Sequence, residues 1–503
     1  MKKLMHMGER SKIGQQEMIC LISEILILGV IIFSSRDVQG NKGEIIVIVI
    51  IILVLMFLLG LYAFFKWELH KFAFIFILLT GGLLVFVQPI LNTPDETVHF
   101  DRAEMVSNGV IVIDSDILEY DTIQSTVDLR NELHKTYTQS GLTEKEINYT
   151  SAKTLHVAAA NPAFLYFPQA LGIRIAKILH LKVIWLLWLG RLMNLLSYSL
   201  LISLGIKIAP KWKFPLFFVA TLPISIQQAA SCSPDAMINS LSLLLISYFL
   251  YLYSEENIKI TQREIIIFSL IGVFVTLAKV TNIFLVGLIL IIPKERFSNE
   301  KKVFLIKGMV IVGIVILGGV YYLYTMSFPM NLEHKAYLES IEAEVDAGKQ
   351  LQYILNNTLK WMHDFLASLI EQADNYVITL NSFGWLDYGY SILNIIVVFE
   401  LGKVCIQEQG VAISQVGKFL IFLMVGGIYC ATCLALYISW TSVGASYVSG
   451  VQGRYFIPMI ALFTLMFSNL SDYTRKKEKY MTDMTVITSM LGVLLVITTL
   501  RYY

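Results

Sequence analysis

Charged residues are scarce in this chain. Only 15% of its 503 residues are Asp, Glu, Lys or Arg, whereas 56% are hydrophobic. Soluble globular domains usually carry about 25% charged residues. The formal net charge of +1 gives no electrostatic reason to expect a nucleic-acid partner. The composition therefore excludes an ordinary soluble protein and indicates one that is embedded in a membrane.

Cysteine is also scarce, and a cleavable leader is lacking. The five cysteines lie mostly in or beside apolar runs, and even the CxxC formed by Cys430 and Cys433 has the surroundings of a membrane span. Packing thiols explain them better than a metal or redox site. No small-residue cleavage site follows the first apolar run, so we expect no cleavable signal peptide.

Long apolar runs are abundant, and they predict an all-α polytopic membrane protein. A helix needs about 20 apolar residues to cross a bilayer. Candidate spans are 18–34, 45–65, 72–91, 183–206, 214–231, 236–253, 303–325, 389–404, 419–440, 455–470 and 484–500. The run 265–292 is too long for one span and is interrupted at Lys279, so we interpret it as two short helices. The sequence thus predicts about 13 transmembrane helices.

The distribution of lysine and arginine orients these spans. With thirteen spans, all clusters of basic residues between them fall on the side of the N-terminus, which the positive-inside rule assigns to the cytoplasm. These clusters are Lys2, Lys3, Arg10 and Lys12; Lys66 and Lys71; Lys207, Lys211 and Lys213; Lys259 and Arg263; Lys294, Arg296, Lys301 and Lys302; and Arg475, Lys476, Lys477 and Lys479. We therefore expect a cytoplasmic N-terminus.

This orientation places two long polar segments, 92–160 and 326–387, outside the cytoplasm. The first holds twelve acidic and five basic residues, which suits an extracytoplasmic loop rather than a clamp for anionic lipid. We divide the chain into 1–71, a cytoplasmic N-terminus with two extra spans; 72–470, a transmembrane domain with both loops; and 471–503, a basic cytoplasmic loop with the last span. Two broad loops on such a scaffold favour an outward-facing active site.

The segment 93–100, Thr-Pro-Asp-Glu-Thr-Val-His-Phe, follows the third span directly. One interpretation is a helix start, with Thr93 as N-cap, Pro94 at the first position, Glu96 closing a capping box, and Gly109 ending the helix. The other interpretation is catalytic. A carboxylate at a lipid–water boundary loses hydration unless it is solvated, paired or coordinating.

In the catalytic interpretation, Asp95, His99 and Arg102 share one helix face, and Arg102 contacts the acceptor or has an accessory role. Asp95 is the candidate general base for an acceptor hydroxyl. Glu96 points elsewhere, where it orients neighbouring groups or joins Asp95 in holding a divalent cation. His99 stabilises a leaving phosphate or contacts Asp95. The two interpretations are compatible, because a cap would position the base.

Several short motifs resemble known proteins. Residues 95–100 resemble the Asp-Glu-x-x-His-Phe motif in the first outer loop of protein O-mannosyltransferases. The whole chain more closely resembles the bacterial membrane family named domain of unknown function 2142, which is placed in the GT-C glycosyltransferase superfamily. The matching stretches run in family order: 94–100, Asn-Pro-Ala-Phe-Leu-Tyr-Phe-Pro-Gln-Ala-Leu-Gly at 161–172, Gly-Arg-Leu-Met-Asn at 190–194, Ser-Pro-Asp-Ala at 233–236, Gly-Trp-Leu-Asp at 384–387 and Gly-Val-Gln-Gly-Arg-Tyr-Phe-Ile-Pro at 450–458.

This resemblance implies a GT-C-like bundle in a bacterial cytoplasmic membrane, with a polyprenyl-phosphate sugar as donor. It places a contact with the donor phosphate at Lys279, for which a snorkelling turn residue is the alternative. Asp387 would line the acceptor path on the family pattern alone. No cofactor is implied beyond a possible divalent cation.

Two arginines and one aspartate complete the candidate site. Arg191 lies inside an apolar span, where it either contacts phosphate or forms a helix–helix ion pair. Arg454 follows a glycine-containing segment at the outer end of a span. A guanidinium there either binds phosphate through two hydrogen bonds or only anchors the span at the membrane surface. Asp235 follows Ser233 and Pro234, which favours helix capping, with an accessory role as the alternative.

The leading hypothesis is a membrane glycosyltransferase that inverts the sugar and acts on an extracytoplasmic glycan or similar acceptor. A lipid-linked glycan transporter is the first alternative, although the polar residues concentrate in loops rather than along the spans. A surface-glycan polymerase or ligase is the second, and only the size of the acceptor distinguishes it.

Overall fold

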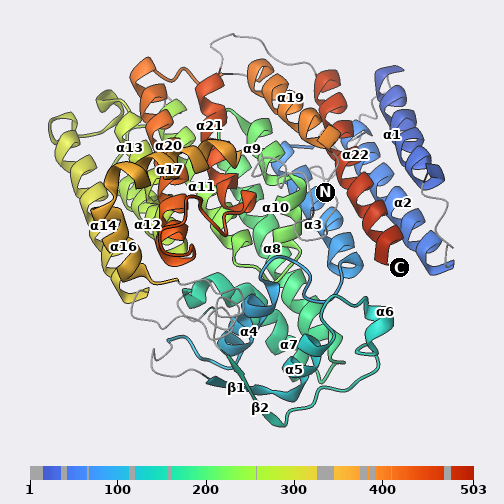
Figure 1. Ribbon diagram of the computed structural model, residues 1–503. Helices are drawn as coiled ribbons and strands as arrows, with labels where there is room; N and C mark the ends of the chain where they lie inside the picture. The colour runs from blue at the N-terminus through green and yellow to red at the C-terminus, as the bar shows by residue number, and fades with distance from the viewer. Residues whose placement is uncertain are drawn as a thin grey trace.

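The computed structural model describes residues 15–34, 42–64, 67–112, 119–155, 158, 161–255, 258–325, 345–373, 383, 391–408, 410–468 and 477–502. These residues are mostly helical (Figure 1). The helices of the bundle are α1 (Gln15–Ser34), α2 (Lys42–Phe64), α3 (Leu69–Val87), α8 (Ile184–Ile208), α9 (Lys213–Ala220), α10 (Pro223–Ala229), α11 (Asp235–Ser254), α12 (Gln262–Ala278), the 3₁₀ helix η2 (Val280–Gly287), α13 (Leu288–Ile291), α14 (Val303–Thr325), α19 (Ser391–Gln407), α20 (Gln415–Ser439), η6 (Gly453–Phe456), α21 (Ile457–Thr464), η7 (Leu465–Phe467) and α22 (Lys477–Tyr502). Two short 3₁₀ helices, η3 (Lys294–Arg296) and η4 (Glu300–Lys302), connect α13 to α14.

Seven helices in the described part of the chain are long and apolar enough to cross a membrane. They are Gly43–Phe64, Leu69–Val87, Ile184–Ile208, Asp235–Ser254, Glu300–Thr325, Gln415–Ser439 and Tyr480–Tyr502. The chain is therefore a multi-pass membrane protein, as its composition predicts. Other expected spans coincide with shorter apolar helices, including Val280–Ile291 and Gly453–Phe467.

The sequence misjudges one span and locates one break correctly. Residues 214–231 do not form a single helix but the short helices α9 and α10, because Pro223 starts a new helix after the turn at Thr221 and Leu222. The expected interruption at Lys279 is confirmed, since α12 ends at Ala278 and Lys279 adopts an extended conformation before η2.

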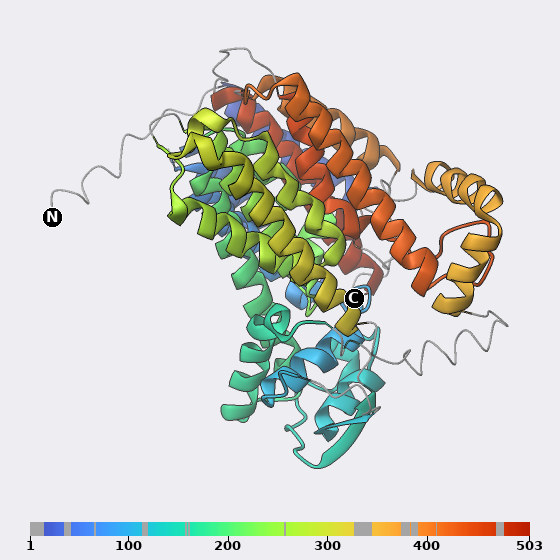
Figure 2. The same ribbon diagram turned by 90° about the vertical axis from the view of Figure 1, so that its left-hand side faces the viewer.

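A loop subdomain lies at one end of the bundle (Figures 1 and 2). It comprises α4 (Glu96–Ser107), β1 (Glu119–Ile123), α5 (Gln124–Asn131), α6 (Tyr137–Ser140), β2 (Ser151–Leu155), η1 (Ala163–Tyr166) and α7 (Phe167–Ile178). Strands β1 and β2 pair antiparallel with Glu119 opposite Leu155. Helix α7 packs along α8 and α4, so the subdomain rests directly on the bundle.

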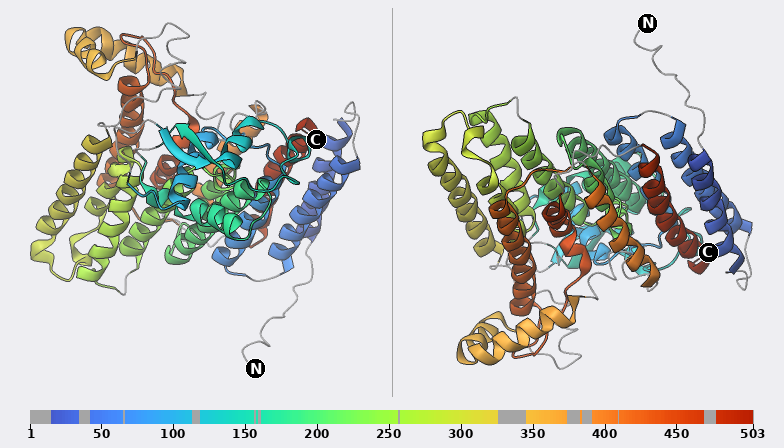
Figure 3. Two further views of the ribbon diagram at one scale, coloured as in Figure 1. Left: turned by 90° about the horizontal axis from the view of Figure 1, so that it is seen from below. Right: turned by 90° about the horizontal axis from the view of Figure 1, so that it is seen from above.

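The second polar segment contributes α16 (Ala347–Asn356) and α17 (Thr358–Glu371), which lie beside the bundle at the right of Figure 2. Phe365 and Leu369 of α17 pack with Tyr437 of α20. At the opposite edge, α1 and α2 pack against α22, so the first and last helices of the described chain lie side by side (Figure 3). The two extra N-terminal helices are thus joined to the bundle through its last helix.

Candidate active site

Asp95 lies at the junction of the loop subdomain and the bundle. It is the N-cap of α4 and adopts a left-handed backbone conformation with φ of 60°. The helix begins at Glu96, so the expected start with Thr93 as N-cap and Pro94 at the first position is wrong. Thr93 instead accepts a hydrogen bond from the amide of Gln88 through its hydroxyl. The left-handed turn at Asp95 separates this part of the chain from the helix. The predicted end of the helix is confirmed. Asn108 is the C-cap of α4, and Gly109, which follows it, has a φ of 90°.

Arg454 joins two carboxylates that are far apart in the sequence. Its Nη2 pairs with Asp95 and its Nη1 donates to Asp235 Oδ2 at 3.0 Å. Gln452 Oε1 accepts from Arg454 Nε at 2.8 Å, which fixes the plane of the guanidinium. The exposed fractions differ: 3% for the Arg454 side chain and 11% for Asp235, but 38% for Asp95. Asp95 is therefore the member of this group that solutes can reach.

Asp235 does not cap α11 as its sequence context favoured. The N-cap of α11 is Pro234, which forms no side-chain cap, and Asp235 is the first helical residue. Its carboxylate faces Arg454, while the Ser233 hydroxyl accepts a hydrogen bond from the Asp235 amide at 3.2 Å. The accessory role is the alternative that fits this geometry.

Lys279 and Tyr455 complete the cluster. The Lys279 Nζ lies 3.7 Å from the centroid of the Tyr455 ring, and the Arg454 guanidinium lies 5.1 Å from the same centroid. Cation–π contacts of this kind hold a cation without neutralising its charge. Lys279 is the cap residue that follows the end of α12 at Ala278. The break in the helix therefore places its ammonium group beside the Tyr455 ring.

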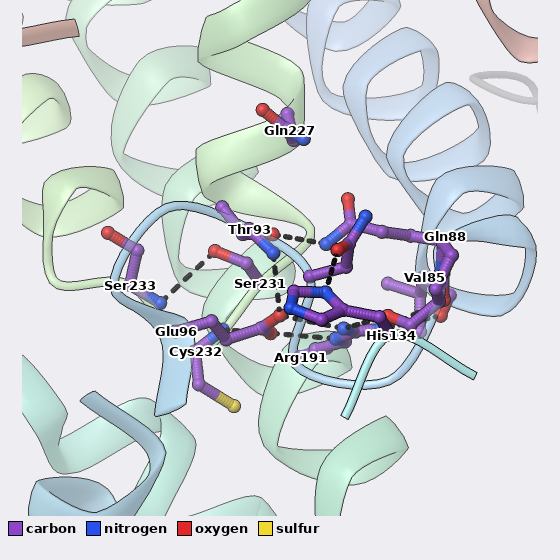
Figure 4. A network of polar contacts seen from close by, with 12 residues as sticks. Val85, Gln88, Thr93, Glu96, His134, Arg191, Gln227, Ser231, Cys232 and Ser233 are labelled. Atoms are coloured by element: carbon purple, nitrogen blue, oxygen red, sulfur yellow. Dashed lines mark hydrogen bonds and ion pairs between the residues drawn. The ribbon is translucent and has the colours of Figure 1, made fainter. Parts of the chain in front are cut away.

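Glu96 and Arg191 form a buried ion pair, which corrects two expectations (Figure 4). Arg191 Nε donates to Glu96 Oε1 at 2.8 Å and Arg191 Nη2 donates to Oε2 at 2.7 Å, and both side chains are 0% exposed. Glu96 is therefore not placed to act on a substrate, and Arg191 is not placed to bind donor phosphate. The helix–helix ion pair that we considered for Arg191 is the arrangement observed.

This pair fastens α4 to several other segments. Glu96 also accepts hydrogen bonds from the backbone amides of Cys232 at 3.0 Å and Thr93 at 3.3 Å. Arg191 donates in addition to the carbonyls of Val85, Gln88 and Pro89 at the end of α3 (Figure 4). The ion pair thus fixes the start of α4, and with it the position of Asp95.

A divalent cation shared by Asp95 and Glu96 does not fit this arrangement. Both Glu96 oxygens are occupied by Arg191 and backbone amides, and Asp95 is paired with Arg454. Among the residues that the structure describes, no group of three or more His, Cys, Asp or Glu side chains is placed to hold a metal ion. We therefore propose no chemical step that depends on a metal ion.

His99 takes part in a short polar chain. Its Nδ1 lies 2.9 Å from the Tyr166 hydroxyl, which accepts a hydrogen bond from the Asn161 amide at 2.9 Å. When that hydroxyl donates its own proton to Nδ1, the imidazole carries its proton on Nε2. Burial lowers the pKa of His99 to about 4, although the nearby Asp95 carboxylate opposes this shift. His99 is thus a neutral donor at neutral pH.

Arg102 does not join this group, although it shares the helix. Its guanidinium donates to the carbonyls of Val110 and Ile111 at 3.0 Å and of Asn161 at 3.4 Å. Arg102 therefore stabilises the loop subdomain, and its expected role towards the acceptor is not supported. Asp387, the other candidate for the acceptor path, lies outside the described residues.

Sequence reasoning missed Tyr166, Tyr455 and Gln452 as members of the site. All three lie inside the stretches that carried the family resemblance, and Gln452 and Tyr455 lie beside the candidate Arg454. Aromatic and amide side chains have no charge to mark them in an apolar sequence, so only their contacts reveal them.

The family comparison matches most of the chain. The model described as "Predicted membrane protein (DUF2142)" matches residues 78–463. The chain belongs to this family. The match includes every group of the site from Asp95 to Arg454, and it begins after α1 and α2. No curated protein and no solved structure matches the chain.

Proposed function

We propose that this protein is a membrane glycosyltransferase of the GT-C type. It transfers a sugar from a polyprenyl phosphate to an extracytoplasmic acceptor such as a cell-surface polysaccharide. The observation that supports this most is the partly exposed Asp95 carboxylate, held by a buried Arg454 that Asp235 also binds. A carboxylate that is accessible yet fixed in position is what a general base requires.

The proposed reaction is a single displacement. The acceptor hydroxyl gives its proton to Asp95 as its oxygen attacks the anomeric carbon of the donor. The bond from that carbon to the phosphate oxygen breaks, and its electron pair leaves with the polyprenyl phosphate. Attack opposite the leaving group inverts the configuration of the sugar.

The charges of the site are suited to the leaving group. Lys279 contacts an aromatic ring in the described structure, so its charge is not neutralised by that partner. We assign it the main contact with the donor phosphate. Arg454 contacts the same ring and holds Asp95 in place through their ion pair. His99 offers its Nε2 proton to an oxygen of donor or acceptor.

The orientation belongs to the same proposal. With a cytoplasmic N-terminus, the three expected spans before residue 92 put the loop subdomain outside the cytoplasm, in a bacterial cytoplasmic membrane. Asp95 then faces the compartment in which surface glycans are completed. The lipid-linked donor reaches Lys279 from within the bilayer.

The experiment is a transfer assay with purified protein in detergent. The protein is incubated with polyprenyl-phosphate sugars and an acceptor glycan, and the released lipid phosphate is measured. We expect release by the wild type and by Asp121→Asn, whose side chain is 71% exposed on β1 away from the site. Asp95→Asn should release none. Equal release by Asp95→Asn and the wild type would contradict the proposal.

A lipid-linked glycan transporter is the second candidate, because charged groups also lie within the bundle. Lys403 of α19 pairs with Glu400 at 2.5 Å and with Asp483 of α22 at 2.8 Å, and Asp483 is 0% exposed. Charges at such positions in membrane helices often mark translocation pathways. Movement of lipid-linked glycan across vesicles, unaffected by Asp95→Asn, would favour this candidate over the transferase and over a polymerase or ligase.

A further inference from the structure

A groove runs along the surface that α12 and α14 form together. Its volume is about 1030 Å³. Apolar side chains of both helices form most of its walls, including Ile266, Val273, Met309 and Leu317. One end is polar and is lined by Thr261, Gln262, Ser298, Asn299 and Lys302. The groove therefore has the polarity of a lipid, with one polar end and a long apolar body.

The dimensions of the groove fit one hydrocarbon chain. Its lining extends from Thr261 to Val273 on α12 and from Lys302 to Leu317 at α14. At 1.5 Å per helical residue, these stretches are about 18 Å and about 22 Å long. One leaflet of the hydrocarbon core is about 15 Å thick, so the groove is long enough for an acyl chain that extends through one leaflet.

The charged side chain that lines the polar end is positive. Lys302 lines the groove there and is exposed, and Lys301 lies next to it in η4. Ser298 and Asn299 supply hydrogen-bonding groups beside it. A phosphate diester with a hydroxyl-bearing headgroup complements this set, because lysines at a membrane surface favour anionic lipids.

We propose that this groove binds an anionic phospholipid. One acyl chain lies between α12 and α14, and the phosphate contacts Lys302. The inference does not depend on the proposed glycosyl transfer, since it concerns a lipid that is not a reactant.

The polyprenyl donor is a different occupant and can be distinguished. Its phosphate would lie at Lys279, which is 18 residues along α12 from Thr261 and hence about 27 Å away. A donor tail in the groove would leave Lys302 without a phosphate partner. Substitution of Lys302 therefore separates the two lipids.

Gly313 offers a substitution that fills the groove. It lines the groove, and a Cβ built on it meets nothing within 4 Å. The Cβ of Gly313→Phe therefore has free space, and we expect the ring to occupy the space of the acyl chain. Gly319 is a matched control, because it lies on the same helix, has the same open surroundings and does not line the groove.

The test uses the full chain in detergent with equal amounts of phosphatidylglycerol and phosphatidylcholine, and native mass spectrometry counts the lipids retained. We expect the wild type and Gly319→Phe to retain phosphatidylglycerol preferentially, and Gly313→Phe to lose it. Lys302→Gln should lower the preference for phosphatidylglycerol about fivefold, while Lys301→Gln, outside the groove, changes it little.

Two results would overturn the assignment. Retention of phosphatidylglycerol by Gly313→Phe at the wild-type level would show that the groove is not the binding site. An unchanged preference in Lys302→Gln, with loss of lipid in Gly313→Phe, would show that Lys302 does not hold the phosphate and would overturn the assignment of this end of the groove to an anionic headgroup. If Gly313→Phe fails to fold, Lys302→Gln alone decides, because its exposed side chain makes misfolding unexpected.

Discussion

Glu96→Gln tests the conclusion that adjacent carboxylates have different roles. The substitution keeps the size of the side chain but removes the charge that neutralises Arg191, and both residues are 0% exposed. Breaking a buried ion pair by removing one partner costs about 3–5 kcal/mol, because the other charge stays buried without compensation. The new amide also turns donor hydrogens towards groups that already donate, including the Cys232 amide. We therefore expect a large loss of stability.

The assay is thermal unfolding of purified protein in one detergent at one scan rate, since membrane proteins often unfold irreversibly. For a chain of this length, we expect the midpoint of Glu96→Gln to fall by about 3–5 °C. Adding Arg191→Met should recover part of this loss, because the double variant contains no unpaired buried charge.

Asp95→Asn provides the comparison. Asparagine tolerates the left-handed conformation of residue 95, so the midpoint should stay near the wild-type value while transfer falls by about 10²–10⁴-fold. If Glu96→Gln unfolds at the wild-type midpoint but loses transfer activity, the structural role of Glu96 is refuted. Glu96 would then take part in the reaction itself.

Three further predictions concern other parts of the molecule. Arg454→Lys should lower the rate of transfer about tenfold or more in donor-titration kinetics, because one ammonium group cannot make both charge-assisted contacts of the guanidinium. If Arg454→Lys keeps the wild-type donor affinity and rate, Arg454 does not belong to the site. Because the pKa of His99 falls from about 6.5 in the unfolded chain to about 4, its contribution to stability is complete above pH 6.5 and is lost as the pH falls towards 4. The unfolding midpoint should therefore drop less between pH 7.5 and pH 5 in His99→Asn than in the wild type, and equal drops would contradict the assignment of a neutral imidazole. Single cysteines at the exposed positions Glu144 and Gly348 should react with an impermeant thiol reagent in intact cells, whereas one at Lys301 should not; labelling at Lys301 would reverse the proposed orientation.

Much of the helical arrangement follows from local sequence. A long apolar run forms a helix in a bilayer because no water is present to satisfy its backbone groups, so the positions of α3, α8, α11 and α14 could be predicted within a few residues. The break at Lys279 is local in the same sense, since a lysine interrupts the run. The run 214–231 misled the prediction because its hydrophobicity continues through a turn that Pro223 sets.

The pairing of charges could not be read from the sequence. Asp95 and Glu96 are neighbours with the same functional group, yet one pairs with Arg454 at a partly exposed position and the other with Arg191 at a fully buried one. Periodicity indicated only that the two side chains point in different directions. It could not indicate which arginine each carboxylate meets, because those partners lie 359 and 95 positions away in the chain.

The sequence by itself determined that this is a multi-pass helical membrane protein with a polar segment after its third expected span. It could do so because the hydrophobicity and length of a segment depend only on the residues of that segment. The tertiary structure decided which of the candidate residues form one site. In the structure, Glu96, Arg191 and Arg102 have structural roles. The residues that lie together in one site are Asp95, Asp235, Lys279, Arg454 and Tyr455. The physical reason is that the rotation and packing of each helix depend on contacts with helices distant in sequence, and those contacts fix where every charge is buried or exposed.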